Sequence, residues 1–288
     1  MADSALAQVR LRLQGLQMWL ASWTETMMSI WQYEGVQDIS PYATAIDQTV
    51  CLYCSSALLL DVGDMSDAAT YDEMNYGWSD DFTTRSEATV GICGICGWWI
   101  YNVRTRVGGH SPPSQHLKVG ILRQLDLSDV RVPVEEARAY LAAKYDARFT
   151  IDPRLFEEVV ASVFRDHGFS TEVTAYSGDG GIDVILNQPK GGTVGVQVKR
   201  HKGRIAVNQI RELTGSLMLG GHTKGIFVTT SRFQSGAQPT ADASAARGYP
   251  IELVDAPAFY DALKIAQLNS PGDVRERKPW GEVPKWRF

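Results

Sequence analysis

Three polar residues interrupt two short apolar segments in the second half of the chain. Asp183 lies in the run at 182–186 (IDVIL), and Gln197 and Lys199 lie in the run at 194–199 (VGVQVK). In a strand, the side-chain period of two places the valines of the second run on one face and Gln197 with Lys199 on the other. An acid and a lysine in buried strands cost free energy unless they are paired or bind a metal ion. An ion pair between Asp183 and Lys199 would account for two of these residues but not for Gln197.

A fourth candidate lies on a helix that the sequence predicts from Asp152 to about His167. An Asp-Pro pair is typical of a helix N-terminus, and the glycine after His167 is typical of an end. At about 100° per residue, Glu158 lies opposite the apolar stripe and Glu157 lies at its edge. We therefore expect Glu158 to be solvated and Glu157 to be available to a site. The stripe consists of Phe156, Val159, Val160, Val163 and Phe164.

The four cysteines form two pairs of identical spacing, Cys51 with Cys54 and Cys93 with Cys96. A two-residue gap lets both thiolates of a tight turn reach one Zn²⁺, and two such turns complete a tetrahedral site. An iron–sulfur cluster or a redox dithiol is the alternative. Residues 51–107 resemble a zinc ribbon, with a longer segment between the two knuckles than in compact ribbons. We expect a structural zinc that replaces a missing core.

A basic run directly follows the strand that carries Gln197 and Lys199. The whole chain has 28 Lys and Arg against 33 Asp and Glu, a formal net charge of −5, so its overall field does not attract nucleic acid. Any phosphate-binding surface must therefore be local. Such a run is ordinarily a solvated loop, but its attachment to this strand indicates contact with a DNA backbone. Its members after Lys199 are Arg200, His201, Lys202 and Arg204.

These residues must be positioned by an alternation of strands and helices that starts near residue 152. Strands are predicted at 171–176, 182–187, 193–199, 225–230 and 250–254, and helices at 206–219, 236–247 and 257–267. This order predicts an α/β fold with a mixed central sheet flanked by helices. The glycine-rich turn at 177–181 (SGDGG) has neither a Walker lysine nor GxGxxG spacing, so we interpret it as the turn that positions Asp183.

The order of these motifs resembles the catalytic domain of Mrr-type restriction endonucleases. The resemblance covers about residues 150–263 and rests on the segments 156–160 (FEEVV), 177–183 (SGDGGID), 196–200 (VQVKR), 226–233 (IFVTTSRF) and 251–255 (IELVD). It implies the restriction-endonuclease-like PD-(D/E)xK nuclease fold, with Gln197 in place of the usual second acid.

The resemblance also implies a role for each candidate residue. Asp183 would be the main Mg²⁺ ligand, the Gln197 side-chain oxygen and the Val198 carbonyl could add ligands, and Mn²⁺ could replace Mg²⁺. Lys199 would hold and polarise the attacking water. Glu157 would orient water or help to hold a second ion. Because Gln197 carries no charge where relatives carry an acid, we expect weak Mg²⁺ binding before the substrate arrives.

The N-terminal half departs from the family, many members of which carry a winged-helix DNA reader there. Apolar residues three and four apart predict one long helix over 5–31, either packed on its own domain or used for dimerisation. We expect a helical segment at 1–50, the zinc ribbon-like domain at 51–107, a linker and helix at 108–150, the endonuclease domain at 151–267 and a tail at 268–288.

Composition narrows the remaining choices. Hydrophobic residues make up 44% and charged residues 21%, which is typical of a folded globular protein, and no apolar stretch is long enough to span a membrane. The N-terminus has no signal-peptide layout, so we expect a cytoplasmic protein. The expected function is Mg²⁺-dependent hydrolysis of double-stranded DNA in prokaryotic restriction or antiviral defence, by a homodimer or higher oligomer. The alternatives are a repair or junction-resolving nuclease and an inactive DNA-binding subunit of the same fold.

Overall fold

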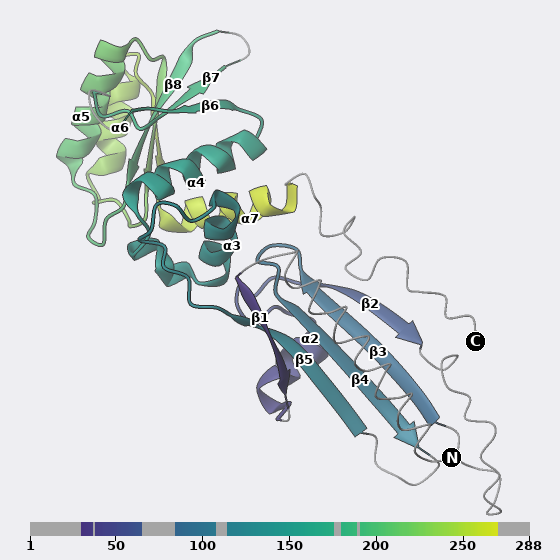
Figure 1. The fold of residues 1–288 in the computed structure, drawn as a ribbon. Coiled ribbons are helices and arrows are strands. Elements are labelled where there is room, and N and C mark those ends of the chain that lie inside the picture. Colours follow the sequence, from purple (N-terminus) through teal and green to yellow (C-terminus); the bar gives the residue numbers. More distant parts are fainter. Residues whose placement is uncertain are drawn as a thin grey trace, which may run out of the picture. The chain divides into compact units, whose positions relative to one another are not determined.

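A computed structural model of the chain describes residues 30–36, 38–64, 84–107, 114–175, 180–188 and 191–269. The chain divides into two compact units, Met1–Gln124 with Gly272–Phe288 and Leu125–Pro271, and each contains one five-stranded sheet (Figure 1). Most of the helix predicted at 5–31 and most of the tail predicted at 268–288 lie outside the described residues. None of the helices in the described segments is long and apolar enough to cross a membrane.

The N-terminal sheet is antiparallel throughout, with the strand order β1-β5-β4-β3-β2. A 3-10 helix (Ser40–Tyr42) and α2 (Ala43–Gln48) follow the first strand. Two buried tryptophans tie the sheet together: Trp98 Nε1 donates to the Gly120 carbonyl at 2.8 Å and Trp31 Nε1 to the Cys96 carbonyl at 2.9 Å. The strands are β1 (Trp31–Val36), β2 (Leu58–Asp64), β3 (Thr84–Cys93), β4 (Trp99–Val107) and β5 (Ser114–Leu122).

Two of these strands lie in segments for which the sequence predicted something else. β1 falls within the segment expected to be helical, and β5 falls within the expected linker at 108–150. In β5, Leu117 and Val119 are buried, whereas His116 and Lys118 are not. This alternation over 116–119 is a strand pattern, but the Gly- and Pro-rich stretch before it led to the prediction of a linker.

The C-terminal sheet has the order β10-β9-β8-β7-β6. β6, β7 and β8 form an antiparallel meander, whereas β8, β9 and β10 are parallel and are joined by α5 and α6. Every strand and helix predicted after residue 152 is present, which confirms the mixed α/β fold. The elements are α3 (Val134–Ala143), a 3-10 helix (Tyr145–Phe149), α4 (Pro153–Asp166), β6 (Ser170–Val173), β7 (Val184–Asn187), β8 (Thr193–Lys199), α5 (Val207–Gly220), β9 (Lys224–Thr229), α6 (Ala237–Ala245), β10 (Ile251–Val254) and α7 (Ala256–Asn269).

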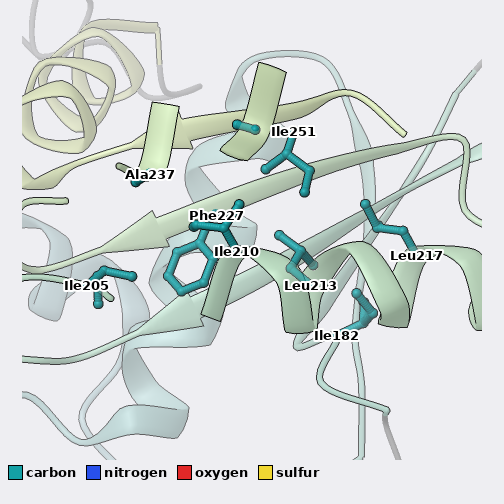
Figure 2. Close-up of a cluster of buried hydrophobic side chains, with 9 residues drawn as sticks. Ile182, Ile205, Ile210, Leu213, Leu217, Phe227, Ala237 and Ile251 are labelled. Carbon is teal, nitrogen blue, oxygen red and sulfur yellow. The ribbon is translucent and has the colours of Figure 1, made fainter. Parts of the chain in front are cut away.

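Helices cover both faces of the C-terminal sheet (Figure 1). On one face, α4 packs beside α7, and the rings of Phe156 and Phe259 meet edge to face with centroids 5.4 Å apart. On the other face, α5 and α6 bury a separate apolar cluster against the sheet (Figure 2). Its larger members include Ile205, Ile210, Leu213, Leu217, Phe227 and Ile251. The sheet is thereby fixed from both sides, and its strand ends can hold polar side chains in defined positions.

The start of α4 is fixed by its N-cap residue. Asp152 Oδ1 accepts hydrogen bonds from the backbone N–H groups of Arg154 at 2.8 Å and Leu155 at 3.1 Å. These contacts satisfy two of the N–H groups that a helix N-terminus leaves without partners. The cap therefore sets where the first turn of α4, with Arg154 and Glu157, begins.

Candidate active site and cysteine cluster

Asp183 lies one residue before β7, where its carboxylate replaces a backbone acceptor. Its N–H donates to the Val196 carbonyl of β8 at 2.9 Å. Two residues further along β8, the Val198 N–H donates to Asp183 Oδ2 at 2.6 Å. The acid is therefore held by the backbone of the strand that also carries Gln197 and Lys199.

The glycine turn that precedes Asp183 packs tightly against α5. Gly180 and Gly181 have φ values of +61° and +87°, which favour glycine. The Ser216 hydroxyl donates to the Gly180 carbonyl, and a Cβ on Gly181 would lie 3.2 Å from Ser216 Oγ and 3.8 Å from Gln197 Nε2. The turn thus has the left-handed conformation and close approach that only glycine accommodates easily, and it leads directly into Asp183.

Gln197 and Lys199 share one face of β8, as the sequence predicts. Both side chains are half-buried. Val196, which precedes Gln197, and Val198, which lies between Gln197 and Lys199, are buried. The Asp183 carboxylate accepts from the N–H of Val198, the residue between Gln197 and Lys199 on β8. The structure therefore places the acid against the stretch of β8 that carries the amide and the ammonium group.

Gln197 has an unusual oxygen atom. Its Oε1 is buried and has no hydrogen-bond partner among the described residues. Leaving such an atom without a partner costs about 1–3 kcal/mol. An amide oxygen on the strand whose Val198 N–H binds the Asp183 carboxylate suits a hard divalent cation, which prefers carboxylate and amide oxygens. The donors present therefore fit Mg²⁺ or Mn²⁺.

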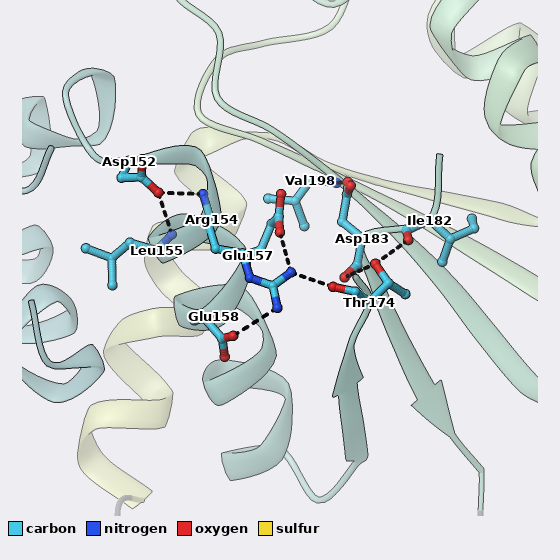
Figure 3. Close-up of polar contacts among 9 residues, drawn as sticks. All are labelled: Asp152, Arg154, Leu155, Glu157, Glu158, Thr174, Ile182, Asp183 and Val198. Atoms are coloured by element: carbon cyan, nitrogen blue, oxygen red, sulfur yellow. Dashed lines mark hydrogen bonds and ion pairs between the residues drawn. The ribbon is translucent and has the colours of Figure 1, made fainter. Parts of the chain in front are cut away.

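Glu157 and Glu158 differ as helix geometry predicts, but one arginine binds both. The Glu157 side chain is 18% exposed and the Glu158 side chain 36%. Arg154 Nη1 lies 3.1 Å from Glu157 Oε2, and Arg154 Nη2 lies 3.4 Å from Glu158 Oε1. Figure 3 shows the two carboxylates on different sides of the guanidinium group, with Glu157 on the side nearer Asp183.

The basic residues after β8 are all exposed on a loop that is well anchored. Thr230, which is 2% exposed, donates through Oγ1 to the His201 carbonyl at 3.0 Å and accepts from the His201 N–H at 2.9 Å. Arg200 Nη1 donates to the Phe149 carbonyl at 3.2 Å. Lys202 and Arg204 have no side-chain partner among the described residues. The loop thus presents fixed positive charge beside the end of the strand that carries Lys199.

Comparison with known proteins identifies the family of the C-terminal unit. Residues 149–263 match the family model described as Restriction endonuclease, the Mrr catalytic domain. These residues form a restriction-endonuclease domain. The match agrees with the predicted family and with the interval in which the candidate site lies. No curated protein matches the chain.

Solved structures similar to this chain include three nucleases. Restriction endonuclease FokI bound to DNA has 14% identity and a TM-score of 0.35, with 48% of this chain and 30% of that chain covered. A repair endonuclease from Pyrococcus abyssi has 14% identity and a TM-score of 0.24, with 60% and 80% covered. EndoMS in complex with double-stranded DNA has 11% identity and a TM-score of 0.27, with 80% and 98% covered. The chain thus spans less than a third of the FokI chain.

Three residues of the endonuclease domain that the sequence did not single out help to build the site. Arg154 binds Glu157, and Thr230 holds the basic loop. Thr174 donates through its side-chain hydroxyl to the main-chain carbonyl of Asp183. Arg232 is a further basic residue next to the loop, because its carbonyl accepts from the Ile205 N–H at 2.8 Å. The sequence could have indicated the role of Thr230 through the hydroxyl-rich run 229–231 after an apolar strand, because such side chains bind nearby backbone groups.

The four cysteines of the N-terminal unit come together as two matching turns. All four are buried and unoxidised, and their Sγ atoms lie within 4.8 Å of one another. In the first turn, the Ser55 N–H donates to the Cys51 carbonyl at 3.0 Å. In the second turn, the Gly97 N–H donates to the Cys93 carbonyl at 2.9 Å. Ser55 and Gly97 have positive φ, at 59° and 76°. This arrangement confirms the predicted zinc ribbon-like cluster.

The four thiols of the cluster shift one another's pKa values. Hydrogen bonds from Cys51 lower the pKa of Cys54 and of Cys93. Contacts with Cys54 raise the pKa of Cys51, and contacts with Cys51 raise that of Cys96. The Sγ atoms lie closest in two pairs, Cys51 with Cys96 at 3.5 Å and Cys54 with Cys93 at 3.3 Å. A tetrahedral Zn²⁺ with thiolate ligands fits this set of donors.

Proposed function

We propose that the chain is a Mg²⁺-dependent endonuclease that hydrolyses phosphodiester bonds of double-stranded DNA in restriction or anti-phage defence. The observation that carries the proposal is the buried Gln197 Oε1 without a partner among the described residues, on the same face of β8 as Lys199 and next to Val198, whose N–H binds the Asp183 carboxylate. A structural ion pair explains neither this oxygen nor the glycine turn that aims Asp183. The restriction-endonuclease family of residues 149–263 supports the same reaction.

Each residue has a definite task in this proposal. Asp183 and Gln197 hold the cation, and the Val198 carbonyl is a further candidate ligand. Once bound, Mg²⁺ lowers the pKa of water and neutralises charge on the phosphodiester. Lys199 orients the nucleophile through its ammonium group, which has no ion-pair partner among the described residues, and stabilises negative charge on the phosphate. Glu157 positions water from the α4 side.

The exposed basic loop supplies the nucleic-acid contact. Arg200, His201, Lys202 and Arg204 follow the strand of Lys199 without a break, so a phosphate backbone that reaches the active site also passes this loop. Phosphate contacts of this kind fix register and do not read sequence. We propose that cleavage of both strands uses two copies of the chain, because one chain offers one such active site among the described residues.

The zinc cluster has a separate, structural task in the proposal. Cys51, Cys54, Cys93 and Cys96 bind one Zn²⁺ that stabilises the N-terminal sheet, since the knuckles connect directly to β2, β3 and β4. The ion takes no part in hydrolysis.

The deciding experiment is incubation of the full chain with methylated, unmethylated and phage DNA, each with Mg²⁺, Mn²⁺ or chelator. Cleavage of duplex DNA that chelator abolishes is the expected result. Preference for branched over linear duplex would favour a repair or junction nuclease, and salt-dependent binding without cleavage would favour an inactive subunit. Absence of both binding and cleavage with every substrate would overturn the proposal.

A further inference from the structure

Arg154 connects three elements at the edge of the candidate active site. It lies in the first turn of α4, and its side chain is 19% exposed. Its Nη1 contacts Glu157 Oε2 at 3.1 Å and also donates to the Thr174 carbonyl at 2.6 Å (Figure 3). Its Nη2 pairs with Glu158 at 3.4 Å. A planar guanidinium can make these divergent contacts together, whereas an ammonium group cannot hold the same geometry.

Thr174 links Arg154 to Asp183. Thr174 N–H donates to the Asp183 carbonyl at 3.0 Å, and Thr174 Oγ1 lies 2.8 Å from the Ile182 carbonyl and 3.0 Å from that of Asp183. A continuous path of hydrogen bonds therefore runs from the Glu157 carboxylate through Arg154 and Thr174 to the main chain of Asp183. The path joins α4, the residue after β6 and the residue before β7.

The contacts of Arg154 also distinguish Glu157 from Glu158. The Nη1 group that binds Glu157 is the one that binds Thr174, so Glu157 is tied to the strand end. The contact with Glu158 uses the other nitrogen and reaches a more exposed carboxylate. Contacts to charged groups in a partly buried site are stronger than those in full solvent. Removing the guanidinium would leave Glu157 without this charge-assisted contact and would detach α4 from the Thr174 carbonyl.

We propose that Arg154 is a positioning residue: it fixes the Glu157 carboxylate relative to Asp183 and assembles the acidic side of the site before a metal or DNA binds. The proposal rests on the proposed nuclease function. It assigns Arg154 no contact with substrate or metal; its effect on cleavage passes through Glu157. A displacement of about 1 Å in a catalytic group can cost about 100-fold in rate, so this task has a measurable consequence.

The test compares Arg154→Met and Arg154→Lys with wild type, using Arg165→Met as the matched control. Arg165 is an exposed arginine in the last turn of the same helix. We expect Arg154→Met to lower kcat about 10- to 100-fold with KM for DNA unchanged, Arg154→Lys to recover part of the loss, and Arg165→Met to cut at the wild-type rate. Wild-type kcat in Arg154→Met would overturn the proposal.

A double-mutant cycle separates positioning from a general structural role. If Arg154 acts through Glu157, Arg154→Met adds little, about two-fold at most, once Glu157→Gln is present. Multiplication of the two single effects would overturn the proposal. This non-additivity is a readout that a loss of overall stability does not produce.

A measurement on the metal-free protein keeps the proposal testable even without cleavage. We expect Arg154→Met to reduce hydrogen-exchange protection of the Thr174 and Val198 amides, which bind Asp183, and to leave the amides in the middle of α4 unchanged. Unchanged protection at both amides would overturn the inference. If wild type does not cleave DNA but these amides lose protection, the proposed function fails while the positioning role stands.

Discussion

The Val198 N–H and the Asp183 carboxylate are joined by a 2.6 Å hydrogen bond, so β8 itself holds the acid that precedes β7. A side-chain oxygen here takes the place of the next carbonyl in the β7–β8 ladder. The consequence is an acid whose position depends on the same strand as Gln197 and Lys199. All three groups are therefore positioned by β8, as preorganised catalysis requires.

The first prediction follows from this arrangement. Asp183→Asn keeps an oxygen that can accept from Val198 but removes the charge needed for a divalent cation. Lys199→Met removes the ammonium group and leaves the apolar stem. We expect each variant to remain folded by circular dichroism and to lose about 1,000-fold or more in cleavage. Glu172→Gln, which alters an exposed carboxylate on β6, is the control and should cut normally. Cleavage by either site variant at the wild-type rate would show that the active site lies elsewhere.

The second prediction concerns the glycine turn. Gly180→Ala and Gly181→Ala each place a Cβ at positive φ, which costs about 1–2 kcal/mol of stability. A Cβ at Gly180 meets nothing within 4 Å, whereas one at Gly181 meets Ser216 and approaches Gln197. We expect similar melting temperatures for the two variants but a loss of cleavage of about 10-fold or more for Gly181→Ala alone. Equal activity of the two variants would show that the glycine turn does not control the position of Gln197.

The third prediction tests the basic loop through its salt dependence. Lys202→Ala combined with Arg204→Ala removes two exposed charges without disturbing the contacts of Thr230. If both meet phosphates, binding to duplex DNA weakens and the slope of log K against log salt falls by about 1.8, at about 0.9 per contact. Arg165→Ala should leave the slope unchanged. An unchanged slope in the double variant would place the DNA on another surface.

The fourth prediction concerns the metal of the N-terminal unit. Protein purified without chelator should contain about one zinc per chain, and Cys54→Ser or Cys93→Ser should lose it. These variants should unfold at lower temperature, because a metal bound by all four cysteines ties the turn before β2 to the turn between β3 and β4. Lys199→Met should keep its full zinc content. Elemental analysis that finds no zinc in the wild-type protein would contradict this assignment.

The sequence predicted the endonuclease fold and the faces of its strands, but not how the site residues are held. Gln197 and Lys199 follow from a period of two along one strand, and Glu157 follows from the helical period along α4. By contrast, the contact of Arg154 with the Thr174 carbonyl joins residues 20 positions apart whose approach depends on the packing of α4 against β6. No local pattern encodes that approach. β5 was missed for a different reason: the Gly- and Pro-rich stretch between β4 and β5 was interpreted as a linker, although the two strands pair directly across it.

The last prediction concerns two chemically identical neighbours, Glu157 and Glu158. Both contact Arg154, so a shared ion pair does not distinguish them; their directions do. The Glu157 side chain is half as exposed as that of Glu158, at 18% against 36%, and its arginine nitrogen is the one bound to Thr174. A carboxylate on that side can reach the site of Asp183, whereas Glu158 cannot do so without unwinding the first turns of α4.

We therefore expect Glu157→Gln to lower cleavage about 100-fold or more, the lower end for a lost acid–base or metal-positioning group. Glu158→Gln should remain within a few-fold of wild type, since it removes one exposed partner of Arg154 and leaves the contacts with Glu157 and Thr174 in place. Circular dichroism should show both variants equally folded, because each substitution conserves shape. If the two variants cut DNA equally well, Glu157 has no place in the site, and Asp183, Gln197 and Lys199 carry the reaction without it.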